Sequence, residues 1–179
     1  MSHGAPTVLM LPGYQNSGPG HWQSLWQAAH PDYRRVEQRD WDNPSRPEWV
    51  DALDAAVRAA GGAVVLAAHS LGVMAALHWA AAYRAPVVGA LFVAPADVEW
   101  IEEPPSVKSF RPVPMARLPF PSIVVASDDD LYADLDRVRG WASAWGSRLV
   151  CVHGAGHINA VAGFGPWPEG EALLGELLA

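Results

Sequence analysis

Cysteine and lysine are nearly absent from this 179-residue chain, which has one residue of each, Cys151 and Lys108. A single cysteine excludes a disulfide within the chain and is compatible with a reducing compartment. The 12 arginine and lysine residues do not gather into a basic stripe, and the net charge is −7. This charge distribution argues against nucleic acid as a partner.

Long apolar runs are also missing. No segment approaches the ~20 apolar residues that a membrane-spanning helix requires. Residues 1–6 lack the basic and apolar regions of a secretory signal. We therefore expect a cytoplasmic protein without membrane contact, folded as one domain over residues 1–179 with a core of its own.

Short apolar runs alternate with helical patterns along the chain. Strands are predicted at 7–11, 33–38 (more polar, near a sheet edge), 63–67, 87–93, 122–126 and 148–152. Helices are predicted at 22–29, 46–60 (with a capping box at 45–48), 71–83, 131–145 and 169–178. The proline-rich segment 95–121 reads as an irregular loop, too short for a cap domain. This order predicts the α/β class, with a mostly parallel, doubly wound six-stranded sheet and helices on both faces.

The chain is organised around the segment 61–83. Residues 63–67 form a buried strand and residues 71–83 a helix, so the chain must turn sharply between them. Ala68 and Gly72 are small enough to permit that turn, and Ser70 lies at its apex. This is the strand–turn–helix setting of a G-x-S-x-G nucleophile, with alanine in place of the first glycine. The alternative is an ordinary serine that caps a buried helix.

A glycine-rich loop follows the first strand. Residues 13–18 have the glycine spacing of a phosphate-binding loop, but Pro19 and Gly20 stand where lysine and serine or threonine are required. Nucleotide binding is therefore disfavoured. Such a loop can instead lie over the nucleophile and offer a backbone N–H to an oxyanion.

A base and an acid for Ser70 follow later strands. The chain order Ser…Asp…His is that of α/β-hydrolases. His157 lies in a glycine-rich loop that can return over the sheet, with His153 as the alternative base. His69 is next to the nucleophile but is expected to point away from it, as alternate residues at a tight turn do. The acid candidates are Asp128, Asp129, Asp130 and, after the preceding strand, Asp97; the spacing does not choose among the three consecutive ones.

Five motifs together resemble a known family. They lie, in the family's order, at residues 11–26, 41–49, 68–72, 126–132 and 156–170. The chain resembles the small serine hydrolases related to retinoblastoma-binding protein nine. The resemblance implies a capless α/β-hydrolase fold with a Ser-His-Asp triad at Ser70, His157 and Asp130. The L-x-C-x-E partner motif that the family's name suggests is not present, because the nearest stretch, 149–153, lacks the glutamate; a protein partner is therefore not supported.

The resulting prediction is a serine hydrolase that cleaves a small ester, thioester or amide through an acyl-enzyme. The backbone N–H groups of Tyr14 and Leu71 are expected to form the oxyanion hole, and no cofactor or metal is expected. The expected substrate-binding side chains are Gln15, His21, Trp22 and Trp167. The alternatives are an acyltransferase with the same triad and a catalytically silent hydrolase fold that binds a protein.

Overall fold

The computed structural model describes residues 5–179, which form a six-stranded sheet whose neighbouring strands all pair in parallel. The strands lie in the order β2-β1-β3-β4-β5-β6. In chain order they are β1 (Thr7–Leu11), β2 (Arg34–Arg35), β3 (Val64–His69), β4 (Val87–Val93), β5 (Ser122–Ser127) and β6 (Arg148–Val152). The predicted doubly wound α/β architecture is confirmed.

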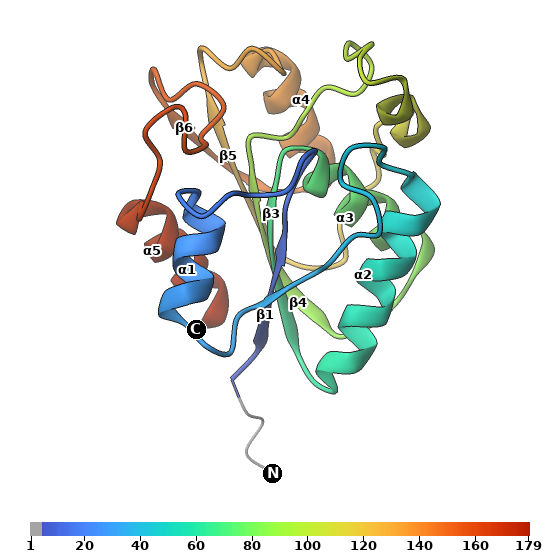
Figure 1. Ribbon diagram of the computed structural model, residues 1–179, viewed down its shortest axis with the longest axis vertical. Coiled ribbons are helices and arrows are strands. Elements are labelled where there is room, and N and C mark those ends of the chain that lie inside the picture. The colour runs from blue at the N-terminus through green and yellow to red at the C-terminus, as the bar shows by residue number, and fades with distance from the viewer. Residues whose placement is uncertain (1–4) are drawn as a thin grey trace.

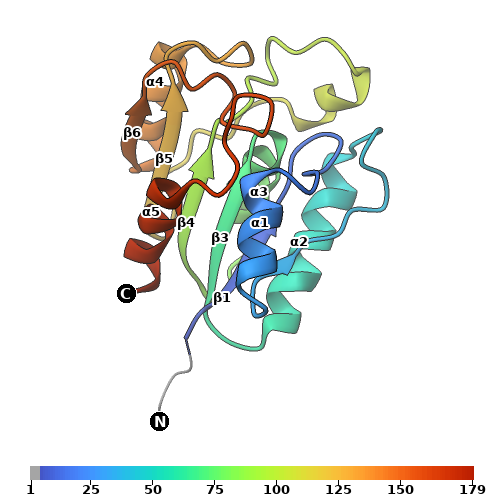
Figure 2. The same ribbon diagram turned by 60° about the vertical axis from the view of Figure 1, so that its left-hand side comes forward.

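Helices cover both faces of this sheet (Figures 1 and 2). They are α1 (Trp22–Ala29), α2 (Arg46–Ala60), α3 (Leu71–Ala82), α4 (Leu135–Trp145) and α5 (Pro168–Leu178). Helices α2, α3 and α4 pack on one face, whereas α1 and α5 pack on the other. None of the helices in residues 5–179 is long and apolar enough to span a bilayer.

The strands supply side chains to two cores, one on each face. In β3, Val64, Leu66 and Ala68 enter the core beneath α2, α3 and α4, while Val65 and Ala67 enter the core beneath α1 and α5. Every residue of β3 is buried. A parallel strand covered on both faces needs apolar side chains at consecutive positions, which explains the continuous apolar run in the sequence.

The carboxyl ends of the strands meet at one edge of the sheet, at the top of Figure 1. There the chain leaves β1 toward α1 on one face and leaves β3 toward α3 on the other face. Because the two connections diverge between adjacent strands, a crevice opens at this point. Ligands of open α/β sheets bind at such a switch point.

Two predicted elements have a boundary that is wrong by more than two residues. Strand β2 spans only Arg34–Arg35 instead of 33–38, because only these two residues of the polar edge segment pair with β1. Helix α4 begins at Leu135 instead of Leu131. Leu131 is 89% exposed and lies in the turn that follows the acidic run.

The predicted capping box at the start of α2 is also wrong. The Ser45 side chain makes no capping hydrogen bond. Glu48 instead pairs with Arg39, at 3.0 Å, so it is turned away from the helix N-terminus.

The connection between β4 and β5 is irregular as expected and contains one short 3₁₀-helix, Pro105–Phe110.

Gly72 sets the distance between α3 and the end of β1. A Cβ atom at this position would lie 2.3 Å from the carbonyl oxygen of Leu11 and 2.7 Å from that of Pro12. Both contacts are with backbone, which cannot rotate away as a side chain can. The small residue expected after the nucleophile is therefore required for packing.

We expect Gly72→Ala to destabilise the fold. Overpacking of this kind costs about 1–3 kcal/mol, and for a chain of this size each kcal/mol lowers Tm by roughly 2–4 °C. Thermal unfolding measures the effect. The matched control is Gly175→Ala in α5, where a Cβ meets nothing within 4 Å; it should leave Tm unchanged or raise it. Equal Tm values for the two variants would contradict the close approach.

Candidate active site

Ser70 occupies a strained turn between β3 and α3. Its backbone has φ 55° and ψ −121°, a conformation that residues other than glycine rarely adopt. Two hydrogen bonds hold it there: the Ser70 N–H donates to Val93 O, and the Ser70 carbonyl accepts from the Val73 N–H, both at 3.0 Å. The Ser70 side chain makes no hydrogen bond to the helix it precedes. The helix-cap alternative is therefore wrong.

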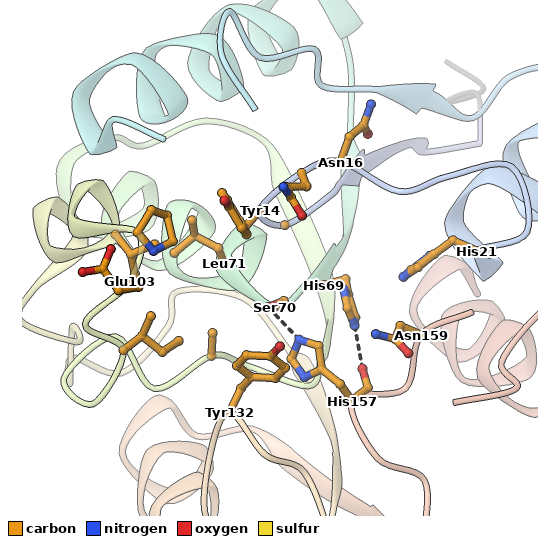
Figure 3. Close-up of a pocket in the computed structure, with 16 residues that line it drawn as sticks. Tyr14, Asn16, His21, His69, Ser70, Leu71, Glu103, Tyr132, His157 and Asn159 are labelled. Atoms are coloured by element: carbon orange, nitrogen blue, oxygen red, sulfur yellow. Dashed lines mark hydrogen bonds between the residues drawn. The ribbon is translucent and has the colours of Figure 1, made fainter. Parts of the chain in front are cut away.

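The hydroxyl of Ser70 is joined to an imidazole and a carboxylate. Its Oγ lies 2.8 Å from His157 Nε2 (Figure 3). His157 Nδ1 lies 2.9 and 3.0 Å from the two carboxylate oxygens of Asp130. The Asp130 side chain is only 4% exposed. A carboxylate can only accept, so Nδ1–H donates to Asp130 and Nε2 remains free to accept the serine proton.

The other two aspartates of the acidic run bind the same loop at different points. Asp128 lies 2.7 Å from Nδ1 of the exposed His153, and this hydrogen bond lowers the pKa of Asp128. Asp129 accepts the backbone N–H of Gly156 at 2.7 Å. The three carboxylates thus fasten the loop after β5 to the loop after β6, and only Asp130 reaches the imidazole that contacts the serine.

Asp97, the fourth acid candidate, lies outside this group. Its side chain is completely buried and forms an ion pair with Arg137 of α4 at 2.5 Å. The Asp97 N–H donates to Tyr132 O at 2.8 Å. Asp97 therefore braces the turn that follows Asp130 and does not contact His157.

Two backbone N–H groups are available beside the serine. The loop after β1 lies against the nucleophile, because a Cβ atom at Gly13 would be 2.9 Å from Ser70 Cβ and 3.2 Å from Leu71 N. Tyr14 and Leu71 both line the cavity at this point. Within residues 5–179 neither of their N–H groups has an acceptor. Both can donate to an oxygen atom bound above Ser70.

A cavity of about 240 Å³ opens at the triad. One part of its wall is apolar and comes from α3 and the connection after β4, through Leu71, Ile101, Pro104 and Val107. Another part is polar and includes Gln15, Asn16, His21, His69 and Asn159. Figure 3 shows Ser70 between Leu71 on one side and His21, His69 and Asn159 on the other.

Of the four predicted substrate-binding residues, the structure places two in the cavity wall and two beneath it. Gln15 and His21 line the cavity. Trp22 is fully buried, and its Nε1–H donates to Ile158 O at 3.0 Å, next to His157. Trp167 is 7% exposed and packs on Trp22 with ring centroids 5.5 Å apart. The expectation that these tryptophans border the pocket is therefore wrong. They pack beneath the loop that follows β6 and carries His157, which we call the histidine loop.

His69 is a site residue that the sequence interpretation missed, since it was expected to point away from the nucleophile. Its ring instead lines the cavity, and Nε2–H donates to the carbonyl oxygen of His157 at 2.8 Å (Figure 3). Burial lowers the pKa of His69 well below its usual value, and the neighbouring His157 lowers it further. A neutral His69 thus holds the backbone of the histidine loop. Its place beside Ser70 was the only sequence signal.

Residues 8–176 match the model of the family described as serine hydrolase. The chain belongs to the serine hydrolase family. The predicted enzyme class is thus confirmed, as is the resemblance to small α/β-hydrolase-fold enzymes. No curated protein matches the sequence.

Solved structures of similar proteins agree with this membership. A putative YdeN-like hydrolase from Pectobacterium atrosepticum is 33% identical with a TM-score of 0.86, over 98% of this chain and 94% of that one. The ydeN gene product of B. subtilis is 19% identical with a TM-score of 0.76, over 96% and 98%. A monoacylglycerol lipase from Paleococcus ferrophilus is 13% identical with a TM-score of 0.68, over 98% and 96%. The last two structures, at these low identities, show only that this serine hydrolase has the same fold as they do.

Proposed function

We propose that this serine hydrolase cleaves a small ester, thioester or amide through a covalent acyl-enzyme on Ser70. The observation that carries the proposal is the unbroken series of hydrogen bonds from Ser70 Oγ through His157 to Asp130 at the cavity. A serine hydroxyl is a weak nucleophile at neutral pH until a base accepts its proton. The hydrogen-bonded His157 Nε2 is positioned to do so.

The reaction has two halves, acylation of Ser70 and hydrolysis of the acyl-enzyme, and both use the same catalytic groups. Ser70 Oγ attacks the substrate carbonyl carbon while its proton passes to His157 Nε2. His157 then gives that proton to the leaving alcohol, thiol or amine as its bond to carbon breaks. Water attacks the acyl-enzyme with His157 again as the base, and the proton returns to Ser70 as the acid departs. Asp130 holds the imidazole in the required tautomer and stabilises the imidazolium.

The oxyanion that forms during each attack needs donors that are already in place. We assign this role to the N–H groups of Tyr14 and Leu71, the residues that directly follow Gly13 and Ser70, which are in close contact. Loss of one donor in a comparable site costs about 3–4 kcal/mol of transition-state stabilisation. Because these are backbone groups on packed elements, they need no rearrangement when charge develops.

A fluorophosphonate probe followed by a screen of acyl substrates tests the proposal. Wild-type protein should label at Ser70, and label and turnover should be lost together after preincubation with unlabelled probe. An acyltransferase would also label but would transfer its acyl group to an added alcohol or amine faster than to water. A protein that neither labels nor turns over any acyl substrate would contradict the proposal in favour of a silent fold.

The cavity indicates a small acyl substrate. Its volume of about 240 Å³ is below the ~300–1,000 Å³ usual for ligand pockets. The irregular connection after β4 supplies apolar wall through Ile101, Pro104 and Val107 but adds no further layer over the site. Each methylene of a longer chain that remains in water forgoes about 0.8 kcal/mol of burial.

We therefore expect kcat/KM on p-nitrophenyl esters to peak between acetyl and butyryl and to fall with longer chains. The series from two to twelve carbons, measured below the micelle-forming concentration of each ester, provides the test. A steady rise toward the longest esters would contradict a small acyl site while leaving the triad assignment intact.

A further inference from the structure

His21 combines a structural role with an unused hydrogen-bond donor. It precedes α1, and its Nδ1 accepts the backbone N–H of Gln23 at 3.2 Å, which caps the helix. A neutral imidazole that accepts at Nδ1 carries its proton on Nε2. Nε2 is buried and has no hydrogen-bond partner among residues 5–179. The His21 residue as a whole is only 6% exposed.

The imidazole of His21 is neutral at physiological pH. Burial, together with the nearby charge of Arg35, lowers the pKa of His21 to about 4. Its Nε2–H is therefore a permanent donor rather than a group that gains and loses charge. A buried donor without an acceptor is uncommon in folded proteins, because its desolvation is not compensated.

This donor belongs to the polar side of the cavity. His21 lines the cavity wall together with His69 and Asn159, and its ring packs on His69 with centroids 4.8 Å apart. In Figure 3 these three side chains lie on one side of Ser70, whereas Leu71 and Glu103 lie on the other. His69 donates its Nε2–H to His157 O, and no acceptor among residues 5–179 lies within hydrogen-bond distance of His21 Nε2.

We propose that the polar side of the cavity binds an uncharged oxygen acceptor of the substrate, an ether, hydroxyl or carbonyl oxygen, with His21 Nε2–H as its donor. This inference rests on the proposed function, because it describes the substrate of the same site. The substrate is accordingly asymmetric about the scissile bond, with an apolar group against Leu71 and an oxygen-bearing group toward His21.

An anionic group fits this position less well than a neutral one. No lysine or arginine of the described chain lines the cavity. The guanidinium of Arg35, whose charge acts on His21, already donates to Asn16 Oδ1, Ser17 O and Ser24 Oγ. The whole chain carries a net charge of −7. A hydrocarbon group would also fit less well, since it would leave the Nε2–H unpaired. A neutral oxygen acceptor therefore fits this side of the cavity better than an anionic group or a hydrocarbon group does.

Two pairs of nearly isosteric esters test the proposal. In the acyl pair, p-nitrophenyl methoxyacetate is compared with p-nitrophenyl butyrate, and in the alcohol pair, 2-methoxyethyl butyrate is compared with butyl butyrate. The measured quantity is the ratio of kcat/KM for the ether over the hydrocarbon. Differences in intrinsic reactivity cancel when the ratio of a variant is divided by that of the wild type.

His21→Asn removes the Nε2 donor while retaining a side chain that caps helices well. His21→Phe removes the same donor while keeping a ring of similar size against His69. In both variants the ratio should fall in one of the two pairs, by roughly three- to tenfold, as expected for one neutral hydrogen bond. The affected pair identifies which side of the scissile bond faces His21.

The outcomes separate this inference from the proposed function. If His21 only caps α1 and fills space, the variants change stability or overall activity, but the ratio stays at the wild-type value in both pairs, and the inference is wrong. Because both esters of a pair are measured on one sample, partial unfolding does not alter the ratio. Absence of turnover and fluorophosphonate labelling in the wild type would instead overturn the proposed function itself.

Discussion

Ser70→Ala is expected to abolish turnover and fluorophosphonate labelling while the protein remains folded. In a comparable triad enzyme, loss of the nucleophile lowers kcat about 10⁶-fold. Alanine keeps the Cβ of serine, so the strained backbone at φ 55° and its two hydrogen bonds to Val93 and Val73 are retained. Thermal unfolding should therefore give nearly the wild-type Tm.

The matched control is Ser106→Ala, in the 3₁₀-helix near the site. Ser106 Oγ is buried and has no hydrogen-bond partner among residues 5–179, so its removal should leave labelling and kcat unchanged. Intact-mass spectrometry after labelling should show one added probe for wild type and for the control, and none for Ser70→Ala. A Ser70→Ala protein that still reacts with the probe or turns over substrate would contradict the assignment of the nucleophile.

Much of the fold could be predicted because its signals are local. The apolar runs of β1, β3, β4 and β5 are nearly continuous since both faces of the sheet are covered there, and they mark these strands at nearly their observed bounds. The predicted range of the edge strand β2 was too long because the segment is polar and only Arg34 and Arg35 pair with β1. The predicted capping box is absent because Glu48 forms an ion pair with Arg39, a residue outside its helix.

The site residues that belong to a sequence motif could be predicted. Those whose role depends on the direction in which the side chain points in the folded protein could not. The strand–turn–helix pattern locates Ser70, and the family resemblance selects Asp130 from three adjacent aspartates. Nothing local shows that Trp22 turns beneath the histidine loop to reach Ile158 O, since that bond joins residues 136 positions apart. The inward direction of His69 likewise depends on a carbonyl 88 residues away.

A buried glutamine illustrates the same limit. Gln23 is fully buried, and its Nε2 donates to Leu11 O and Ala67 O, at the ends of the two strands that flank the crevice. Its Oε1 accepts from the Ser17 hydroxyl at 2.6 Å. In the sequence it is one polar residue in an amphipathic helix. Only the tertiary structure shows that it fastens the loop over the nucleophile to the end of the sheet.

Asp130→Asn should lower kcat by orders of magnitude, about 10⁴-fold by the serine-protease precedent. An asparagine that turns its amide N–H₂ toward His157 Nδ1 favours the tautomer with the proton on Nε2, and that tautomer cannot accept the Ser70 proton. The fold should tolerate the change, because the other amide atom can still accept the Tyr132 N–H that now binds Asp130 Oδ1 at 2.9 Å. Kinetics on the best short-chain ester, with Tm as the measure of folding, test this expectation.

The neighbouring aspartates provide the controls, because each has a different partner. Asp128→Asn affects an exposed contact with His153, and Asp129→Asn retains a carbonyl oxygen for the Gly156 N–H and the Ser127 hydroxyl. Both should reduce kcat only mildly, as should His153→Gln. If Asp128→Asn or Asp129→Asn instead caused the large loss while Asp130→Asn remained active, the acid would be displaced along the run, and the hydrogen bonds between Asp130 and His157 would be structural rather than catalytic.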